Sequence, residues 1–580
     1  MSTSIRIDHD LAMTTRDGVT LRADVFRPDD GAKHPAILIR TPYDKSLSWN
    51  SDYLGAVQSA RAGYAFVMQD TRGRFASEGD YLPFMPEGRD GYDAVEWVAS
   101  EPWCDGRVGL AGGSYLGRNQ WQTALEQPPS LKAIAPAIIS SGPLSEWRQA
   151  GALDFESNVS WFSLMAVEIA NRLEREGKDV SEIRRWLERA RTNIDEVLNY
   201  LPFKDVPHFN FEGIREGFQA RSSAALPAGI SSPDDLFWDF SRITVPCLHV
   251  GGWYDMYSGS LFTSFNMMRK HGGSDLARAG QHVLCGPWVH GGQLPSYAGG
   301  LHFGPTANAA GSFSHARQLA FFDRYLLDKV TEIPAVRYFV MGVNQWRNAD
   351  AWPLPNTQWT NFHLSSGGRA QSASGDGILS RDPSGTQPPD RYLYDPNFPV
   401  PTVGGRSLPT GKLVPGPLDQ VHVEARSDVL CYTSAELRED LEVTGPVKLH
   451  LFASTSAKDT DFVAKLVDVY ADGTAYNVAE GVIRAHFREG LFSPKPVVPG
   501  EVYEYVIDMA NTSVVFRAGH RMRLDVTSSN FPRIDRNMNT GNPFGEDAVG
   551  VPAIQTVFHD DKFPSHLELP VIPAREGGAK

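Results

Sequence analysis

A serine flanked by glycines stands where an apolar strand is expected to turn into a helix. The segment 107–117 reads Arg-Val-Gly-Leu-Ala-Gly-Gly-Ser-Tyr-Leu-Gly, and residues 118–126 that follow are typical of a helix. A serine on such a tight turn is exposed for nucleophilic attack, and the backbone N–H of Tyr115 at the helix N-terminus can stabilise negative charge. The pattern is G-x-S-x-x-G, so a glycine-rich turn in which Ser114 is only solvated or caps the helix stays an alternative.

Two later strand ends supply the acid and the base that a serine nucleophile needs. A serine hydroxyl attacks only when a base accepts its proton and an acid orients that base. The strand expected at 245–250 leads to Asp255, and the strand expected at 281–285 leads to His290. Serine, acid and histidine in this chain order, each after a strand, predict a catalytic triad of Ser114, Asp255 and His290.

A second donor for an oxyanion is expected in the loop after an early buried strand. That loop reads Arg-Thr-Pro-Tyr-Asp-Lys over 40–45. The phenolic hydroxyl of Tyr43 is suited to join the N–H of Tyr115 in an oxyanion hole. The residues alone leave a second interpretation open, in which Tyr43 only packs in a turn fixed by Pro42.

Alternating strand and helix signals surround these residues. The apolar runs 36–40 and 64–68 are typical of strands buried on both faces, and 91–98 is typical of an amphipathic helix. This β-α-β order predicts an α/β domain with a mostly parallel sheet. We expect that domain to be discontinuous and to comprise residues 1–145 and 241–352.

The middle and the end of the chain have different patterns. Residues 146–240 are mostly helical in pattern and predict a helical cap inserted between the two halves of the sheet domain. Beyond residue 352, alternating strands are separated by Gly, Pro and Asp turns. They predict an all-β sandwich or jelly roll over residues 353–580.

The composition narrows the classes of partner. The chain has 580 residues and a formal net charge of −14, which argues against nucleic acid as a partner. No run approaches the ~20 apolar residues of a membrane span, and the N-terminal residues contain no apolar signal core, so we expect a cytoplasmic protein that binds no membrane. Four widely spaced cysteines without a C-x-x-C pair argue against a zinc or redox site. The sequence leaves homo-oligomer formation open.

Several segments together resemble one family of enzymes. Gly-Gly-Ser114-Tyr-Leu-Gly, Gly-Trp-Tyr-Asp255 and Gly-Pro-Trp-Val-His290 are similar to segments of the cocaine esterase and X-Pro dipeptidyl-peptidase-like serine hydrolases. Segments 460–469 and 519–526 in the C-terminal half resemble the same family. The resemblance therefore covers nearly the whole chain.

The resemblance implies three domains and a set of site residues. The domains are an α/β-hydrolase core, a helical cap and a C-terminal jelly roll, with Ser114, Asp255 and His290 as the triad. The hydroxyl of Tyr43 and the N–H of Tyr115 form the implied oxyanion hole.

In the esterase branch of this family, aromatic side chains of the cap and of the loop after the triad aspartate line the acyl pocket. Trp147, Trp161 and Tyr257 lie at similar places in this sequence. Packing in the core of the cap is the alternative for these residues.

The triad and the resemblance predict a serine hydrolase that cleaves carboxylic esters, and by the same route amides, of small acyl compounds, without metal or organic cofactor. The alternatives within the family are an X-Pro dipeptidyl aminopeptidase and an α-amino acid ester or β-lactam acylase, which need acidic residues to hold a substrate ammonium. Glu146, Asp154 and Glu156 at the start of the cap are candidates for that role. A non-catalytic protein whose jelly roll binds a carbohydrate or a partner chain is a further hypothesis, which the complete triad disfavours.

Overall fold

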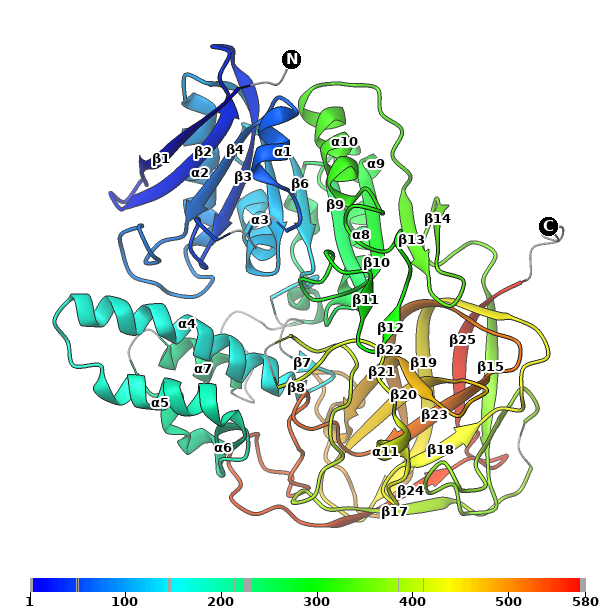
Figure 1. The fold of residues 1–580 in the computed structure, drawn as a ribbon. Helices are drawn as coiled ribbons and strands as arrows, with labels where there is room; N and C mark the ends of the chain where they lie inside the picture. The colour runs from blue at the N-terminus through cyan, green and yellow to red at the C-terminus, as the bar shows by residue number, and fades with distance from the viewer. Residues whose placement is uncertain are drawn as a thin grey trace.

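Two large sheets and a group of helices make up the structure (Figure 1). The computed structural model describes residues 4–47, 50, 52–143, 148–211, 214–222, 232–383, 385–409 and 412–573, with the side chains of 220–222 left out.

The first sheet has ten strands. They are β1 (Ile5–Thr14), β2 (Thr20–Pro28), β3 (His34–Thr41), β4 (Ala65–Asp70), β5 (Cys104–Gly113), β6 (Leu131–Ala137), β9 (Cys247–Tyr254), β10 (Gln281–Val289), β13 (Val336–Val340) and β14 (Gln345–Ala349). Their order across the sheet is β1-β2-β4-β3-β5-β6-β9-β10-β13-β14. The strands from β4 to β13 in this order pair in parallel, whereas β1, β2 and β14 pair antiparallel at the two ends.

Helices cover both faces of this sheet. They are α1 (Ala56–Arg61), α2 (Glu87–Ser100), α3 (Tyr115–Leu125), α8 (Ser258–His271), α9 (Asp275–Ala279) and α10 (Ser314–Leu326). Ile37 and Ile39 of β3 pack in the core that contains Phe321 of α10, whereas Leu38 packs in the core that contains Val95 of α2 and Trp121 of α3. Because successive side chains of a strand point to opposite faces, this double burial explains the continuous apolar run of β3.

The segment between β6 and β9 is mostly helical, as its sequence predicts. It contains α4 (Phe155–Arg175), α5 (Ser181–Thr192), α6 (Ile194–Leu198), α7 (Arg215–Ser222) and a short hairpin of β7 (Arg148–Gln149) and β8 (Ala152–Leu153). One side of α4 is buried through Val159, Phe162, Met165, Ala166 and Ile169. That spacing forms the apolar stripe of an amphipathic helix.

The rest of the chain forms a second sheet of eleven strands, almost all antiparallel, beside a second short hairpin of β11 (Tyr297–Ala298) and β12 (Leu301–His302). This C-terminal β domain confirms the predicted all-β part. Its elements are β15 (Gln358–Ser365), β16 (Ile378–Ser380), β17 (Asp390–Tyr394), α11 (Val421–Glu424), β18 (Leu430–Thr433), β19 (Leu441–Thr455), β20 (Asp461–Val469), β21 (Ala475–Arg484), β22 (Tyr503–Phe516), β23 (Arg521–Thr527), β24 (Ala553–Phe558) and β25 (His566–Ile572).

Two strands of the first sheet run further than the sequence predicts. β9 continues to Tyr254 and β10 to Val289, so Asp255 and His290 follow their strands directly. The glycines after residue 250 suggest a strand end, but here they allow close pairing. A Cβ atom on Gly252 would lie 2.2 Å from the carbonyl oxygen of Trp288 in β10.

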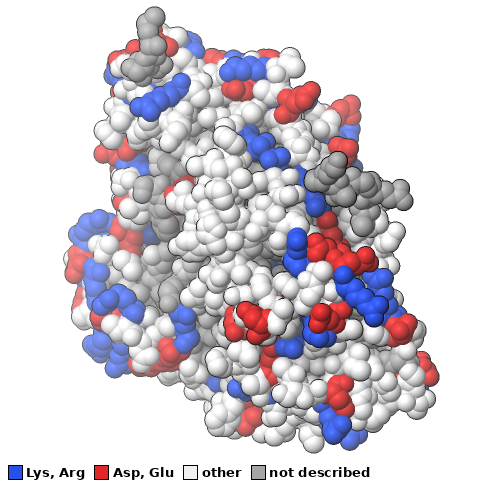
Figure 2. Space-filling view, turned by 45° about the vertical axis from the view of Figure 1, so that its right-hand side comes forward, with Lys and Arg blue, Asp and Glu red and all other residues white. Residues whose placement is uncertain are grey.

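The surface carries both signs of charge. On the face shown in Figure 2, basic and acidic groups are interspersed around a broad area that carries neither. Within the described part of the chain, no helix combines the length and the apolar character needed to cross a membrane.

Candidate active site

Ser114 lies on the tight turn between β5 and α3, with backbone angles φ 59° and ψ −123°. A positive φ is unfavourable for a residue with a side chain, so the turn must be held by its surroundings. The N–H of Ser114 donates to the carbonyl of Ala137 at 3.0 Å, and its own carbonyl accepts from the N–H of Gly117 at 2.8 Å. A Cβ atom on Gly117 would lie 2.9 Å from the oxygen of Ala137, so glycine lets α3 approach β6 closely.

The structure brings the three residues of the predicted triad together. Nε2 of His290 lies 2.9 Å from Oγ of Ser114, and Nδ1 of His290 lies 2.7 Å from Oδ2 of Asp255. Because a carboxylate only accepts, Nδ1 carries the hydrogen and Nε2 is left to accept the proton of the serine hydroxyl. Asp255 is 1% exposed, and its Oδ1 accepts the N–H of Tyr257 at 2.8 Å.

Both expected oxyanion donors lie beside the serine. Tyr115 is the first residue of α3, so its N–H is at the N-terminus of that helix. Tyr43 follows β3, and the rings of Tyr43 and Tyr115 pack edge to face with their centroids 6.3 Å apart. Nε1 of Trp161 donates to the hydroxyl oxygen of Tyr43 at 3.0 Å. A phenol that accepts one hydrogen bond still has its own hydrogen to donate.

The side chain of Tyr115 serves a different purpose from its N–H. Its hydroxyl donates to Oε1 of Glu87 at 2.8 Å and accepts from the N–H of Phe84 at 3.1 Å. Burial, and the neighbouring Glu87 charge, raise the pKa of the Tyr115 phenol well above its usual value. The phenol therefore stays protonated and fixes the first turn of α3.

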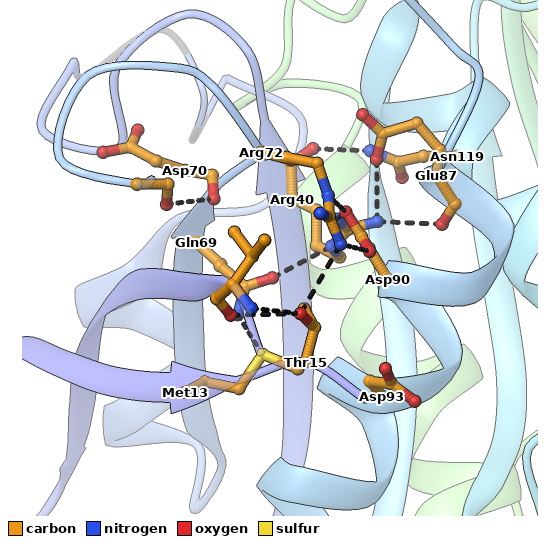
Figure 3. Close-up of polar contacts among 12 residues, drawn as sticks. Met13, Thr15, Arg40, Gln69, Asp70, Arg72, Glu87, Asp90, Asp93 and Asn119 are labelled. Atoms are coloured by element: carbon orange, nitrogen blue, oxygen red, sulfur yellow. Dashed lines mark hydrogen bonds and ion pairs between the residues drawn. The ribbon is translucent and has the colours of Figure 1, made fainter. Parts of the chain in front are cut away.

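A buried arginine anchors the loop that carries Tyr43. Figure 3 shows Arg40, at the end of β3, between Gln69 and Glu87. Its Nε donates to Gln69 at 2.9 Å and its Nη1 to Glu87 at 2.7 Å, while its carbonyl accepts from Asn119 at 2.7 Å. These bonds tie the end of β3 to α2 and α3, the helix that begins after Ser114.

The charged segment after β4 braces the same region. Arg72 donates to Asp90 at 2.7 Å (Figure 3). It also donates to Asp17 at 2.9 Å. Asp70 accepts the N–H of Lys45 at 2.7 Å. Arg74 donates to the carbonyl of Pro42, next to Tyr43, at 2.8 Å. These contacts are structural and none reaches the serine.

Two cavities meet at Ser114 and His290. The smaller measures about 30 Å³ and the larger about 520 Å³. Tyr43, Trp161 and Leu408 line both. The smaller is completed by Phe84, Tyr115, Ile139, Ser157, Met256 and Tyr257. The larger is completed by Asn50, Asp52, Tyr53, Gly113, Leu116, Ile138, Ser160, Leu164, Gly291 and Pro409.

Two of the three expected pocket aromatics contact this site. Trp161 on α4 stacks on Phe84 with the ring centroids 5.4 Å apart. The ring of Tyr257 meets His290 edge to face at 5.8 Å. Trp147 lies outside the described residues.

The acidic residues of the cap entry are engaged elsewhere. Asp154 faces Arg533 of the C-terminal β domain at 3.9 Å, and Glu156, which is fully buried, accepts from Ser160 at 2.7 Å. Neither lines the two cavities as the described residues define them. Glu146 lies outside the described residues.

Sequence reasoning missed Phe84, Leu408 and Asp52. Phe84 and Asp52 lie in loops whose sequence shows no periodicity. Leu408 comes from the segment between β17 and α11, almost 300 residues after the serine. No sequence signal marks these positions, because only the packing of separate parts of the chain brings them to the site.

Comparison with known proteins agrees with this geometry. A family model described as X-Pro dipeptidyl-peptidase (S15 family) matches residues 17–292, and one described as X-Pro dipeptidyl-peptidase C-terminal non-catalytic domain matches residues 328–568. Cocaine esterase of Rhodococcus sp. (strain MB1 Bresler) is 37% identical over 576 residues, which cover 96% of this chain and 97% of the relative.

Two solved structures resemble the whole molecule. An aminopeptidase from the marine sediment archaeon Thaumarchaeota archaeon matches with a TM-score of 0.80 at 25% identity, covering 99% of this chain and 97% of that one. An α-amino acid ester hydrolase matches with a TM-score of 0.78 at 25% identity, covering 98% and 97%. The chain therefore belongs to the cocaine esterase and X-Pro dipeptidyl-peptidase-like family, and it is a serine hydrolase.

Proposed function

We propose that this enzyme hydrolyses carboxylic esters of small acyl compounds, and amides by the same route, with Ser114, His290 and Asp255 as its catalytic triad. The observation that carries the proposal is the hydrogen-bonded chain from Ser114 through His290 to Asp255, which ends in cavities lined mostly by apolar and aromatic side chains. The identity to cocaine esterase over nearly the full length supports ester substrates.

In the first half of the reaction, Nε2 of His290 takes the proton of Ser114 as Oγ attacks the carbonyl carbon. Asp255 holds the imidazole in the required tautomer and stabilises its protonated form. The N–H of Tyr115 and the hydroxyl of Tyr43 donate to the oxyanion, each contributing on the order of 3 kcal/mol in the transition state. His290 then gives its proton to the leaving alcohol, and the acyl group stays on Ser114.

In the second half, water attacks the acyl-enzyme. His290 takes a proton from that water, the same two donors hold the second oxyanion, and the proton returns to Ser114 as the acid leaves.

One observation favours a second substrate class, esters that carry an ammonium group. Asp52 lines the larger cavity, and within the described part of the chain its carboxylate makes no hydrogen bond and no ion pair. Burial raises the pKa of this carboxyl above its usual value, and the nearby His315 offsets only part of that rise. Tyr43, Tyr53 and Trp161 line the same cavity, and a carboxylate among aromatic residues suits a cation.

We also propose the three domains that the sequence predicts. The change from the first sheet to the second between Ala349 and Gln358 supports a boundary near residue 352, and helices α4 to α7 support a cap within 146–240. Four buried free cysteines fit the reducing cytoplasm that we propose as the location.

The decisive experiment replaces the nucleophile. Ser114→Ala is expected to abolish hydrolysis of an aryl acetate and covalent labelling by a fluorophosphonate, while the melting temperature stays near that of the wild type. Turnover by Ser114→Ala at the wild-type rate would refute the proposal.

A further inference from the structure

The turn that carries Asp255 is held from both sides by the C-terminal β domain. Before it, the hydroxyl of Tyr254 donates to the carbonyl oxygen of Asn477 in β21 at 3.2 Å. After it, Nη1 of Arg406 donates to Oγ of Ser258, the first residue of α8, at 3.1 Å. Both clamps lie within four residues of the catalytic acid in the chain.

Arg406 is itself fixed to β21. Its backbone N–H donates to Oε1 of Glu480 at 2.7 Å, and its Nη2 donates to the carbonyl of the same residue. Gly405, with φ 82°, precedes it, and a Cβ atom there would lie 2.3 Å from Oε1 of Glu480. The close approach of this segment to β21 therefore needs glycine.

Groups of both charges are buried around this contact. Nη1 of Arg533 lies 3.2 Å from Oε1 of Glu480, and Nε of Arg533 donates to the carbonyl of Arg406 at 2.7 Å. Arg406, Glu480 and Arg533 are each 5% exposed or less. Burial alone would raise the pKa of Glu480, but the charges of Arg533, Lys465 and Arg406 outweigh it and hold that pKa below its usual value. The guanidinium of Arg406 is buried, so its hydrogen bonds, from Nη1 to Ser258 and from Nη2 to the carbonyl of Glu480, hold it in place.

Ser258 passes this restraint on to the triad. Its N–H donates to the carbonyl of Asp255 at 3.1 Å, and the N–H of the neighbouring Tyr257 donates to Oδ1 of Asp255 at 2.8 Å. The other carboxylate oxygen, Oδ2, faces His290. The positions of residues 257 and 258 therefore set the direction of the Asp255 carboxylate.

We propose that Arg406, although it belongs to the C-terminal β domain, is a positioning residue for the catalytic acid, because through Ser258 it fixes the turn that aims Asp255 at His290. This inference rests on the proposed role of Asp255 in the triad. It assigns part of the catalytic geometry to a region whose family model is described as non-catalytic. Leu408, two residues further on, lines both cavities, so the same anchor holds a wall of the pocket.

The test compares Ser258→Ala and Arg406→Met in the full-length protein, below the melting temperature of each variant. Ser258→Ala is expected to lower kcat several-fold with little change in KM, and Arg406→Met to lower kcat about tenfold to a hundredfold, the range for small errors in catalytic geometry. The acid limb of kcat/KM is expected to move about half a pH unit lower in both, since a displaced carboxylate stabilises the protonated imidazole less well. The double variant is expected to match Arg406→Met.

A matched control separates positioning from general stability. Arg347 of β14 pairs with Glu442 of β19 at 2.6 Å, which also joins the first sheet to the β domain but makes no contact with the Asp255 turn. Arg347→Met is expected to lower the melting temperature and to leave kcat and the acid limb as in the wild type. Ser258→Thr, which keeps the hydroxyl, is expected to restore most of the kcat that Ser258→Ala loses.

The proposal is overturned if Ser258→Ala keeps the wild-type kcat and acid limb, or if Arg347→Met reproduces the losses of Arg406→Met. If Arg406→Met does not fold, kcat and the acid limb of Ser258→Ala and Tyr254→Phe decide the test. Wild-type values in both variants would then overturn the proposal. Fluorophosphonate labelling of the wild type, compared with Ser114→Ala, tests the proposed function separately. Labelling at Ser114 with no effect of Ser258→Ala would leave the function standing and reject only the role of Arg406.

Discussion

The indole Nε1 of Trp161, on cap helix α4, donates a hydrogen bond of 3.0 Å to the hydroxyl oxygen of Tyr43, which follows strand β3 of the first sheet. This bond makes a cap residue part of the surroundings of the oxyanion. The direction of this hydrogen bond matters. Because the Tyr43 oxygen accepts from the indole, the hydrogen of the Tyr43 hydroxyl points away from Trp161. The cap thus shapes the pocket and orients a proposed catalytic donor.

Tyr43→Phe is expected to lower kcat for an aryl acetate by about 10²-fold to 10³-fold, because one oxyanion donor is lost. KM and the melting temperature are expected to change little, since the ring stays. Steady-state kinetics and a thermal melt measure both quantities. An unchanged kcat would remove Tyr43 from the oxyanion hole.

Trp161→Phe is expected to lower kcat less, by about twofold to tenfold, which corresponds to the loss of one hydrogen bond of about 0.5–1.5 kcal/mol. Because the indole acts on the reaction through Tyr43, the two changes are expected to be non-additive. The kcat of the double variant should then equal that of Tyr43→Phe within about twofold. If the fold-losses of kcat in the two single variants multiply in the double variant, Trp161 acts on the reaction by a route other than Tyr43.

Asp52→Asn is expected to reduce selectivity for cationic esters. The measurement compares a trimethylammonium-bearing choline ester with the 3,3-dimethylbutyl ester of the same acid, which has the same shape and no charge. The wild type should prefer the cation, and the ratio of the two kcat/KM values should fall about tenfold in Asp52→Asn, as the loss of about 1.4 kcal/mol gives.

Glu182→Gln is the control for net charge, since Glu182 is an exposed residue of α5. That variant should keep the wild-type ratio. Equal falls in the two variants, or a wild type indifferent to the charge, would reject Asp52 as a cation-binding residue.

Asp70 is expected to make stability depend on pH. Burial raises the pKa of this fully buried carboxyl from 3.8 to about 6, although the N–H of Lys45 favours the charged form. Between these values the folded state binds more protons than the unfolded state. The contribution of Asp70 is therefore greatest below pH 4, falls as the pH rises towards 6, and loses about 3 kcal/mol at most.

Asp70→Asn does not titrate, so the melting temperature of the variant relative to the wild type should rise from pH 4 to pH 6 and then level off. Thermal melts at half-unit pH steps measure this difference. A difference that stays flat across the interval would mean that Asp70 keeps an ordinary acidity in the fold.

The sequence by itself determined the chemical identity of the site. A strand-to-helix serine, an acid and a histidine after later strands, in the required order, predict Ser114, Asp255 and His290, and the structure places these side chains within hydrogen-bonding distance. This inference works because parallel strands present their carboxyl ends at one edge of a sheet, so strand periodicity already locates the residues that follow. The α/β and all-β parts were predictable as well, because continuous apolar runs and alternating apolar and polar residues are different sequence patterns.

Only the tertiary structure decided what surrounds these three residues. Asp52, Phe84 and Leu408 reach the cavities from loops without periodicity, and Arg406 reaches Ser258 from a different sheet. The sequence offers the acids of the cap entry as candidates to hold a substrate ammonium, but Asp154 faces Arg533 instead. Such contacts depend on how whole layers pack, and a buried charge takes the partner that packing brings to it, at any distance along the chain.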